Sequence, residues 1–156
     1  MKIQIEIKGP WRNSPEAKEE LKGYASQIKE VLKYLSKSYP FKLPKTLIIR
    51  PLYSHRGRKG YFGRAYPQKG TKPYQIALNL PKLRDSKKER VQDVIFHESC
   101  HVAEYIIHGR MGHGPAFKAL YGLKYRFKEE EDVRKNRMST CQDSRGQLWG
   151  NMPGLR

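Results

Sequence analysis

Four of the five histidines in this 156-residue chain lie between residues 93 and 118, and two of them flank a glutamate in the stretch HESCH. Residues four apart on an α-helix lie one turn apart on the same face, so a helix here would hold the imidazoles of His97 and His101 side by side. Neutral imidazole binds zinc well, and Glu98, turned about 100° from His97, can act as general base on a water that the ion activates. The H-E-x-x-H spacing therefore predicts a hydrolytic site with one Zn²⁺ per chain.

A catalytic zinc site needs a third protein ligand and one open coordination position. Three downstream residues are candidates: Glu104, His108 and His113. On a straight helix Glu104 lies too far up the axis, and His108 lies about 10 Å beyond His101 at a rise of about 1.5 Å per residue. Three glycines between residues 109 and 114 surround His113 and allow the chain to turn back. His113 is therefore the favoured third ligand.

Apolar residues flank HESCH on both sides of the expected helix, which predicts a helix buried nearly all round. Inward-facing His and Glu side chains in such a helix are costly unless they have a compensating role. Cys100, inside the stretch, is interpreted as a small packing residue rather than a ligand. The surroundings thus favour a metal site over a chance match to the motif.

The elements that must position these residues can be expected from periodicity, caps and turn residues. Strands are expected at residues 3–7, 46–49, 60–66 and 74–80. Helices are expected at 15–38 after an N-cap at Ser14, from a capping box at 86–89 to His108 with Gly109 as its stop, and from Pro115 onward. This order predicts one α+β domain over residues 1–156, with a core at about 14–122 and a poorly defined basic extension at 123–156.

The charge is strongly positive and unevenly distributed. The chain has 32 Lys plus Arg against 15 Asp plus Glu, a net charge of +17, and the interval 31–84 contains 13 basic and no acidic residues. Such a field favours a polyanion, and nucleic acid is the commonest one in cells. The alternative is a basic, soluble surface with no specific partner.

Within that interval, residues 53–74 combine basic and aromatic side chains. Cations neutralise phosphates and aromatic faces can stack on unpaired bases, which predicts contacts to single-stranded DNA or to the DNA backbone. Some of Tyr61, Phe62 and Tyr66 are expected in the core instead. The nucleic-acid contacts predicted from this segment are Arg56, Arg58, Lys59, Arg64, Lys69 and Lys72.

The start of the sequence, MKIQIEIKGP, lacks the apolar core of a signal peptide, and no stretch approaches the roughly 18 apolar residues that span a bilayer. The two cysteines are few for a secreted domain of this size. We therefore expect no membrane association and an intracellular location, in the cytoplasm or at the nucleoid or nucleus.

The stretch HESCHVAEYIIHGRMGHGPAFK resembles the active-site segment of the SprT-like (SprT/Spartan-type) zinc metallopeptidases. The resemblance covers about residues 46–121 and implies a zincin-like domain with a small mixed sheet, an N-terminal helix and a buried active-site helix. It implies zinc ligands at His97, His101 and His113, and a catalytic glutamate at Glu98. It also implies that the strand at 74–80, flanked by two prolines, pairs with an extended substrate as an edge strand.

Many SprT-like proteins carry a four-cysteine zinc ribbon after the protease core, whereas here only Cys141 lies beyond it. DNA contacts are therefore assigned to the acid-free interval. The leading hypothesis is a zinc-dependent endopeptidase that cleaves proteins on or near DNA, such as DNA–protein crosslinks, in DNA repair. One alternative is a nucleic-acid-binding or packaging protein whose zinc is structural or inactive, with a fourth ligand from Cys141 or Glu104. Another is a zinc-dependent hydrolase of nucleic acid itself.

Overall fold

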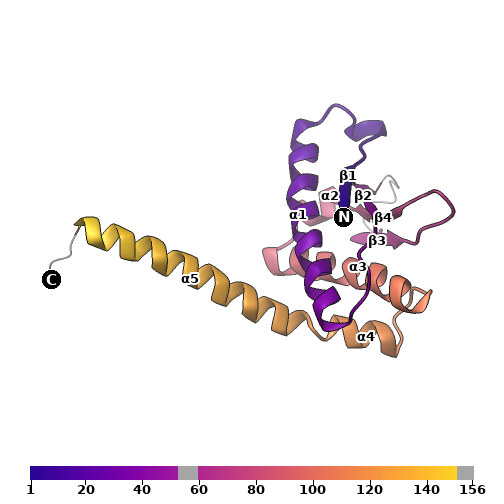
Figure 1. Ribbon diagram of the computed structural model, residues 1–156. Coiled ribbons are helices and arrows are strands. Elements are labelled where there is room, and N and C mark those ends of the chain that lie inside the picture. The colour runs from indigo at the N-terminus through magenta and orange to yellow at the C-terminus, as the bar shows by residue number, and fades with distance from the viewer. Residues whose placement is uncertain (53–59, 151–156) are drawn as a thin grey trace. The chain divides into compact units, whose positions relative to one another are not determined.

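A four-stranded mixed sheet is the scaffold of the candidate site (Figure 1). The computed structural model describes the backbone of residues 1–52 and 60–150, and side chains within these ranges up to residue 139. The strands are β1 (Lys2–Ile5), β2 (Thr46–Pro51), β3 (Gly63–Tyr66) and β4 (Tyr74–Leu78). Their order is β1-β2-β4-β3, with β1 and β4 parallel to β2 and β3 antiparallel to β4. The predicted α+β class with a small mixed sheet is confirmed.

The prediction that the strand at 74–80 lies at an edge is wrong, because β4 pairs with β2 on one side and with β3 on the other. Pro73 and Pro81 lie just outside β4 and therefore remove no hydrogen bond from its ladders. The strand also ends earlier than expected, at Leu78, because the Asn79 side chain accepts from the Lys82 N–H and caps a short helix. On this side of the sheet the terminal strand is β3.

Helices α1 and α3 pack against each other; α1 also contacts β1 and β2, and α3 contacts β3. The bounds of the helical elements in this part of the chain are η1 Gly9–Trp11, α1 Pro15–Ser38, α2 Leu80–Arg84, α3 Lys88–His108 and α4 Pro115–Tyr121. The expected cap of α1 is confirmed, because Ser14 Oγ accepts from the Ala17 N–H at 3.1 Å. Alternate residues of β2, including Leu47 and Ile49, are buried, as expected for a sheet with one covered face.

The start of α3 differs from the predicted capping box. The N-cap is Lys87 and has no side-chain cap, whereas Ser86 Oγ donates to the Lys82 carbonyl oxygen at 2.7 Å. Helix α2, which the sequence analysis did not predict, supplies that acceptor and draws Ser86 away from the cap position. Gly109 ends α3 as expected, with φ of 73°, a left-handed conformation that glycine adopts without steric cost.

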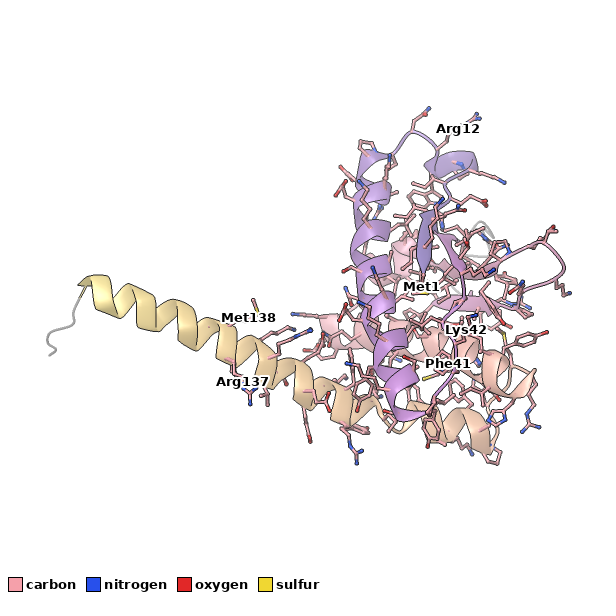
Figure 2. All side chains as sticks on the ribbon, viewed as in Figure 1. Met1, Arg12, Phe41, Lys42, Arg137 and Met138 are labelled. Atoms are coloured by element: carbon pink, nitrogen blue, oxygen red, sulfur yellow. The ribbon has the colours of Figure 1, made fainter. Side chains whose placement is uncertain are left out.

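Residues after Gly122 form a second unit of the structure, Leu123–Arg156, distinct from Met1–Gly122. Its helix α5 (Lys124–Gly150) replaces the irregular extension expected there. The Glu, Lys and Arg residues of α5 favour helix without providing an apolar stripe. Figure 2 shows Arg137 and Met138 projecting from different sides of α5, and Met138 is 67% exposed. The extent of a single SprT-like domain stays a prediction.

Among the residues that the structure describes, no helix is both long enough and apolar enough to cross a membrane.

Candidate metal centre

Helix α3 carries the HESCH residues with their side chains largely buried. Every residue from Val94 to Glu104 is buried except His97, which is partly exposed. Cys100 is fully buried, as its interpretation as a packing residue requires. A helix buried over this length presents His101 and Glu98, exposed by only 9% and 6%, toward the interior of the protein. These side chains are therefore held in place by packing.

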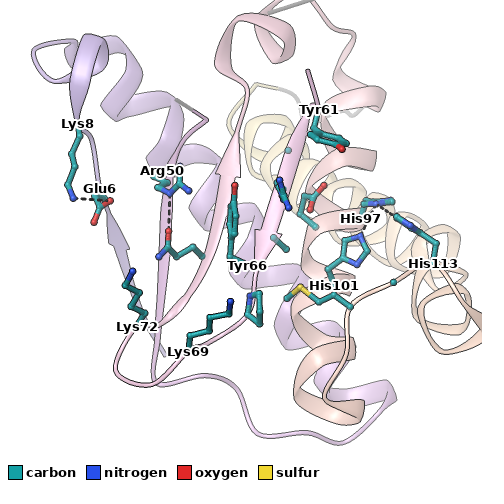
Figure 3. Close-up of a pocket in the computed structure, with 18 residues that line it drawn as sticks. Glu6, Lys8, Arg50, Tyr61, Tyr66, Lys69, Lys72, His97, His101 and His113 are labelled. Carbon is teal, nitrogen blue, oxygen red and sulfur yellow. Dashed lines mark hydrogen bonds and ion pairs between the residues drawn. The ribbon is translucent and has the colours of Figure 1, made fainter. Parts of the chain in front are cut away.

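The three histidines predicted to bind zinc lie together and point toward one another (Figure 3). His97 Nε2 is 3.1 Å from His101 Nε2 and 3.1 Å from His113 Nε2. Nitrogen ligands of a tetrahedral zinc with bonds of about 2.0–2.1 Å lie about 3.3 Å apart. All three ligand nitrogens lie within 4.8 Å of one another, so the cluster could hold a metal ion, and their assignment as ligands stays a prediction.

His113 reaches the other two rings because the chain reverses direction after α3. The turn begins at Gly109, and α4 starts after Gly114 with Pro115 in its first turn. His108, which the helix geometry excluded, is exposed and lies outside the cluster. His113 is itself exposed, so the cluster is open to solvent on that side. An open side is what substrate and water require at a catalytic metal.

Phe117 of α4 packs against all three imidazoles. Its ring is stacked on His101 with a centroid separation of 4.5 Å, and it meets His97 and His113 edge-to-face at 4.8 and 4.9 Å. Such contacts restrict the rotation of the three rings. Phe117 belongs to the stretch that resembles the SprT-like segment, and its simultaneous contact with three rings follows from the placement of α4.

Glu98 follows His97 on α3 and contacts the terminal strand β3. Burial raises the pKa of its carboxyl group from 4.5 to about 7, and a hydrogen bond from the Ala65 backbone N–H acts in the opposite direction. A side chain at position 63 would crowd this carboxylate, because a Cβ built on Gly63 would lie 3.1 Å from Glu98 Cγ. Gly63 therefore allows β3 to approach Glu98 closely. The sequence did not predict the contacts of Glu98 with Ala65 and Gly63. The order of elements along the chain does not show that β3 is the strand that packs against α3.

His101 is prepared to act as a neutral ligand. Burial lowers the pKa of its imidazole from 6.5 to about 4, and the neighbouring His97 and His113 add to this effect. The unprotonated ring is therefore the dominant form at neutral pH. A metal ion needs this form, since its ligand nitrogen must keep a free lone pair.

A cleft of 1030 Å³ joins the histidine cluster to part of the predicted basic segment. Its lining includes His97, Glu98, His101 and His113, together with the basic residues Lys8, Arg50, Arg64, Lys69 and Lys72. Figure 3 shows Lys69 and Lys72 on the sheet side of the same cleft. Three of the six predicted nucleic-acid contacts thus lie in the cleft. The other three, Arg56, Arg58 and Lys59, lie outside the described residues.

The expectation that some of Tyr61, Phe62 and Tyr66 are core residues is wrong. Tyr61 is 68% exposed and the other two are partly exposed. Two of these rings instead make cation–π contacts with one arginine. The Arg64 guanidinium lies 5.9 Å from the centroid of the Tyr61 ring and 5.2 Å from that of the Tyr66 ring. The strand β3 is shorter than predicted and lies at the end of the sheet, and the side chains of Tyr61 and Tyr66 line the cleft.

A family model described as SprT-like family matches residues 29–128 of the chain. No curated protein and no solved structure gives a significant match. The match includes β2, β3, β4, α3 and α4, and with them every residue of the histidine cluster. SprT-like proteins are generally linked to metallopeptidase activity, which agrees with a histidine triad able to hold a metal ion. The chain belongs to the SprT-like family.

Proposed function

We propose that this protein is a zinc-dependent endopeptidase of the SprT-like type with a zincin-like catalytic domain. The observation that carries the proposal is the convergence of three imidazole Nε2 atoms beside a buried glutamate in an open cleft. His97, His101 and His113 would hold the ion. When bound, zinc supplies a Lewis acid that polarises a carbonyl group and makes water a stronger acid.

Glu98 performs the proton transfers in this proposal. Its carboxylate accepts a proton from the attacking water and delivers it to the nitrogen of the leaving amine. Burial raises the proton affinity of Glu98, and the Ala65 N–H fixes the carboxylate against β3. The base is thereby held beside the histidine cluster, where the scissile bond must lie.

The terminal strand β3 is the proposed binding site for an extended substrate. It lies at the end of the sheet order, contacts α3 and reaches Glu98 through Ala65. A polypeptide that adds to such an edge gains main-chain hydrogen bonds that do not depend on sequence. This assignment transfers to β3 the role that the sequence analysis gave to residues 74–80.

A structural zinc would need a fourth protein ligand, for which Glu104 and Cys141 were the candidates. Glu104 Oε2 lies 4.0 Å from His101 Nδ1, the ring nitrogen that is not part of the Nε2 cluster. This position supports a site that keeps its fourth coordination position for substrate and water. Cys141 is beyond the side chains that the structure describes.

The substrate proposal is tested with zinc-loaded protein and an unfolded protein substrate, with and without single-stranded DNA. New peptide amino termini, detected by mass spectrometry, are the expected product, and the DNA should stay intact. Degraded DNA with intact protein would instead support a nucleic-acid hydrolase. Neither product under any condition would overturn the proposed activity.

We further propose that the protein substrates are held on or near DNA, including DNA–protein crosslinks. Support comes from the net charge of +17 and from Arg64, Lys69 and Lys72, which line the same cleft as the histidine cluster. Arg64 lies against two tyrosine rings, so cations and stacking surfaces occur together. This combination suits single-stranded DNA.

Reversing the charge of Arg64, Lys69 and Lys72 should weaken DNA binding and reduce its salt dependence without changing zinc content. If each side chain neutralises one phosphate, the logarithmic salt slope should fall by about two to three. Fluorescence anisotropy at several salt concentrations measures the slope. The control reverses three exposed lysines of α1, Lys18, Lys29 and Lys37, for the same change in net charge. Equal effects of the two triple variants would contradict a DNA site in the cleft.

A further inference from the structure

Glu104 is a buried acidic residue that the proposed chemistry does not use. It lies on α3 one turn beyond His101 and is only 1% exposed. Burying a carboxylate is costly unless partners compensate for the lost hydration. One partner is the Gly112 backbone N–H, which donates to Glu104 Oε2 at 3.0 Å. Gly112 immediately precedes His113, so this bond connects α3 to the turn that presents the exposed histidine.

A second potential partner is the Nδ1 atom of His101. This atom is buried and has no hydrogen-bond partner in the structure, and it lies 4.0 Å from Glu104 Oε2. The other ring nitrogen, Nε2, faces the histidine cluster. A neutral imidazole that keeps its lone pair on Nε2 carries its proton on Nδ1. His101 therefore presents a buried N–H donor beside the Glu104 carboxylate.

We propose that Glu104 is a positioning residue that orders two of the three metal ligands. In the metal-bound protein its carboxylate closes the 4.0 Å separation and accepts the Nδ1–H of His101, which sets the tautomer and the orientation of that ring. It also accepts the Gly112 N–H, which holds the turn from Gly109 to Gly114 in the conformation that places His113 in the cluster. The inference rests on the proposed metal site, but it does not depend on what reaction the site performs.

The physical gain is organisation of the site before the metal binds. A turn of six residues with three glycines has many conformations, and restricting it has an entropic cost. One buried hydrogen bond to a charged acceptor offsets part of that cost in the free protein. Carboxylates that orient metal-bound histidines typically change metal affinity by about 10–100-fold when they are removed.

Two substitutions of Glu104 separate this role from simple space filling. Glu104→Leu removes the acceptor and introduces an apolar side chain of similar size. Glu104→Gln keeps a carbonyl acceptor for the Gly112 N–H and the His101 Nδ1–H. Zinc affinity is measured by competition with a chromophoric chelator. We expect Glu104→Leu to weaken zinc binding by about 10–100-fold and Glu104→Gln to recover most of that loss.

The visible absorption spectrum of the Co²⁺-substituted protein reports on the geometry of the metal ligands. It would stay unchanged if Glu104 only filled space in the core. Its absorption bands depend on ligand geometry, so they should shift in Glu104→Leu and return toward the parent positions in Glu104→Gln. Ser99→Ala serves as the control on the same helix, because the Ser99 hydroxyl is buried and donates instead to the Ile95 carbonyl oxygen. It should leave zinc affinity and the Co²⁺ spectrum unchanged.

The same contact can be tested from its donor side. Gly112→Pro removes the N–H, whereas Gly112→Ala keeps it, and a Cβ at this position would meet no atom within 4 Å. Gly112→Pro should weaken zinc binding in the parent protein and add little in the Glu104→Leu background, since both changes break one interaction. If Glu104→Leu does not fold, the comparison of Gly112→Pro with Gly112→Ala decides alone.

Unchanged zinc affinity in folded Glu104→Leu, or equal affinity of the two Gly112 variants, would overturn the inference while leaving the proposed peptidase intact. Additive losses in the double variant would overturn it as well. A parent protein that binds zinc in a Glu104-dependent way but cleaves no protein would leave the inference standing and remove the proposed function.

Discussion

Glu98→Gln is expected to lower the rate of protein cleavage by about 10²–10⁴-fold while zinc content and folding stay unchanged. The amide has nearly the shape of the carboxylate, and its oxygen can still accept the Ala65 N–H. It cannot accept a proton from water at neutral pH. The substitution therefore removes proton transfer and preserves the local packing of a side chain that is 6% exposed.

The measurement is the rate at which new amino termini form in an unfolded protein substrate, with DNA present. Glu89→Gln provides the matched control, because Glu89 is an exposed glutamate in the first turn of the same helix. Its rate should equal that of the parent. Cleavage by Glu98→Gln at the parent rate, with zinc bound, would show that another group acts as the base.

His113→Ala should lose most of the bound zinc, whereas His108→Ala should retain it. Only His113 lies with His97 and His101, at 3.1 Å between the Nε2 atoms of His113 and His97. Both His108 and His113 are exposed, so neither substitution should greatly change the free energy of unfolding. The two variants therefore differ mainly in the number of ligands left for the ion.

Metal analysis of the two purified proteins after dialysis gives the answer, with thermal unfolding as the check on folding. Equal zinc content in both variants would contradict the assignment of His113. Loss confined to His108→Ala would contradict the turn geometry altogether.

The local parts of this architecture were predictable from the sequence. The Ser14-Pro15 start of α1, the helix that holds HESCH and the stop at Gly109 follow from caps and periodicity within a few residues of each feature. The placement of His113 beside His97 and His101 was also predictable from local sequence. A straight helix holds His108 too far along its axis, whereas the glycines around His113 allow the chain to turn back. The family resemblance depended on the same short stretch, and the SprT-like match over residues 29–128 confirms it.

The parts that depend on spatial neighbours were not predictable in this way. Residues 74–80 looked like an edge strand because prolines flank them, but pairing on both sides is decided by the order β1-β2-β4-β3. Tyr61 and Tyr66 looked like core residues until β3 was placed at the end of the sheet. Helix geometry excludes Glu104 as a ligand and places it one turn from His101 on α3, but its hydrogen bond with Gly112 arises only when the turn folds back.

The same limit applies to substrate recognition. Composition predicts Arg64, Lys69 and Lys72 as DNA contacts, but nothing in their spacing indicates that they line the cleft that contains Glu98. The backbones of Lys69 and Lys72 pair in an isolated antiparallel β-bridge in the turn before β4. The proximity of basic side chains to the histidine cluster is thus a property of the fold, and it links the two halves of the proposed function.

Titration of Zn²⁺ into metal-free protein, with cleavage of an unfolded protein as the readout, tests the central claim most directly. The account predicts no cleavage without metal, and activity that rises in proportion to added zinc until one ion is bound per chain. His113→Ala and Glu98→Gln should stay at least about 10²-fold less active than the parent throughout, the first because it binds little metal and the second although metal is bound. Cleavage by the metal-free protein, or full zinc occupancy of the parent without cleavage, would contradict the account.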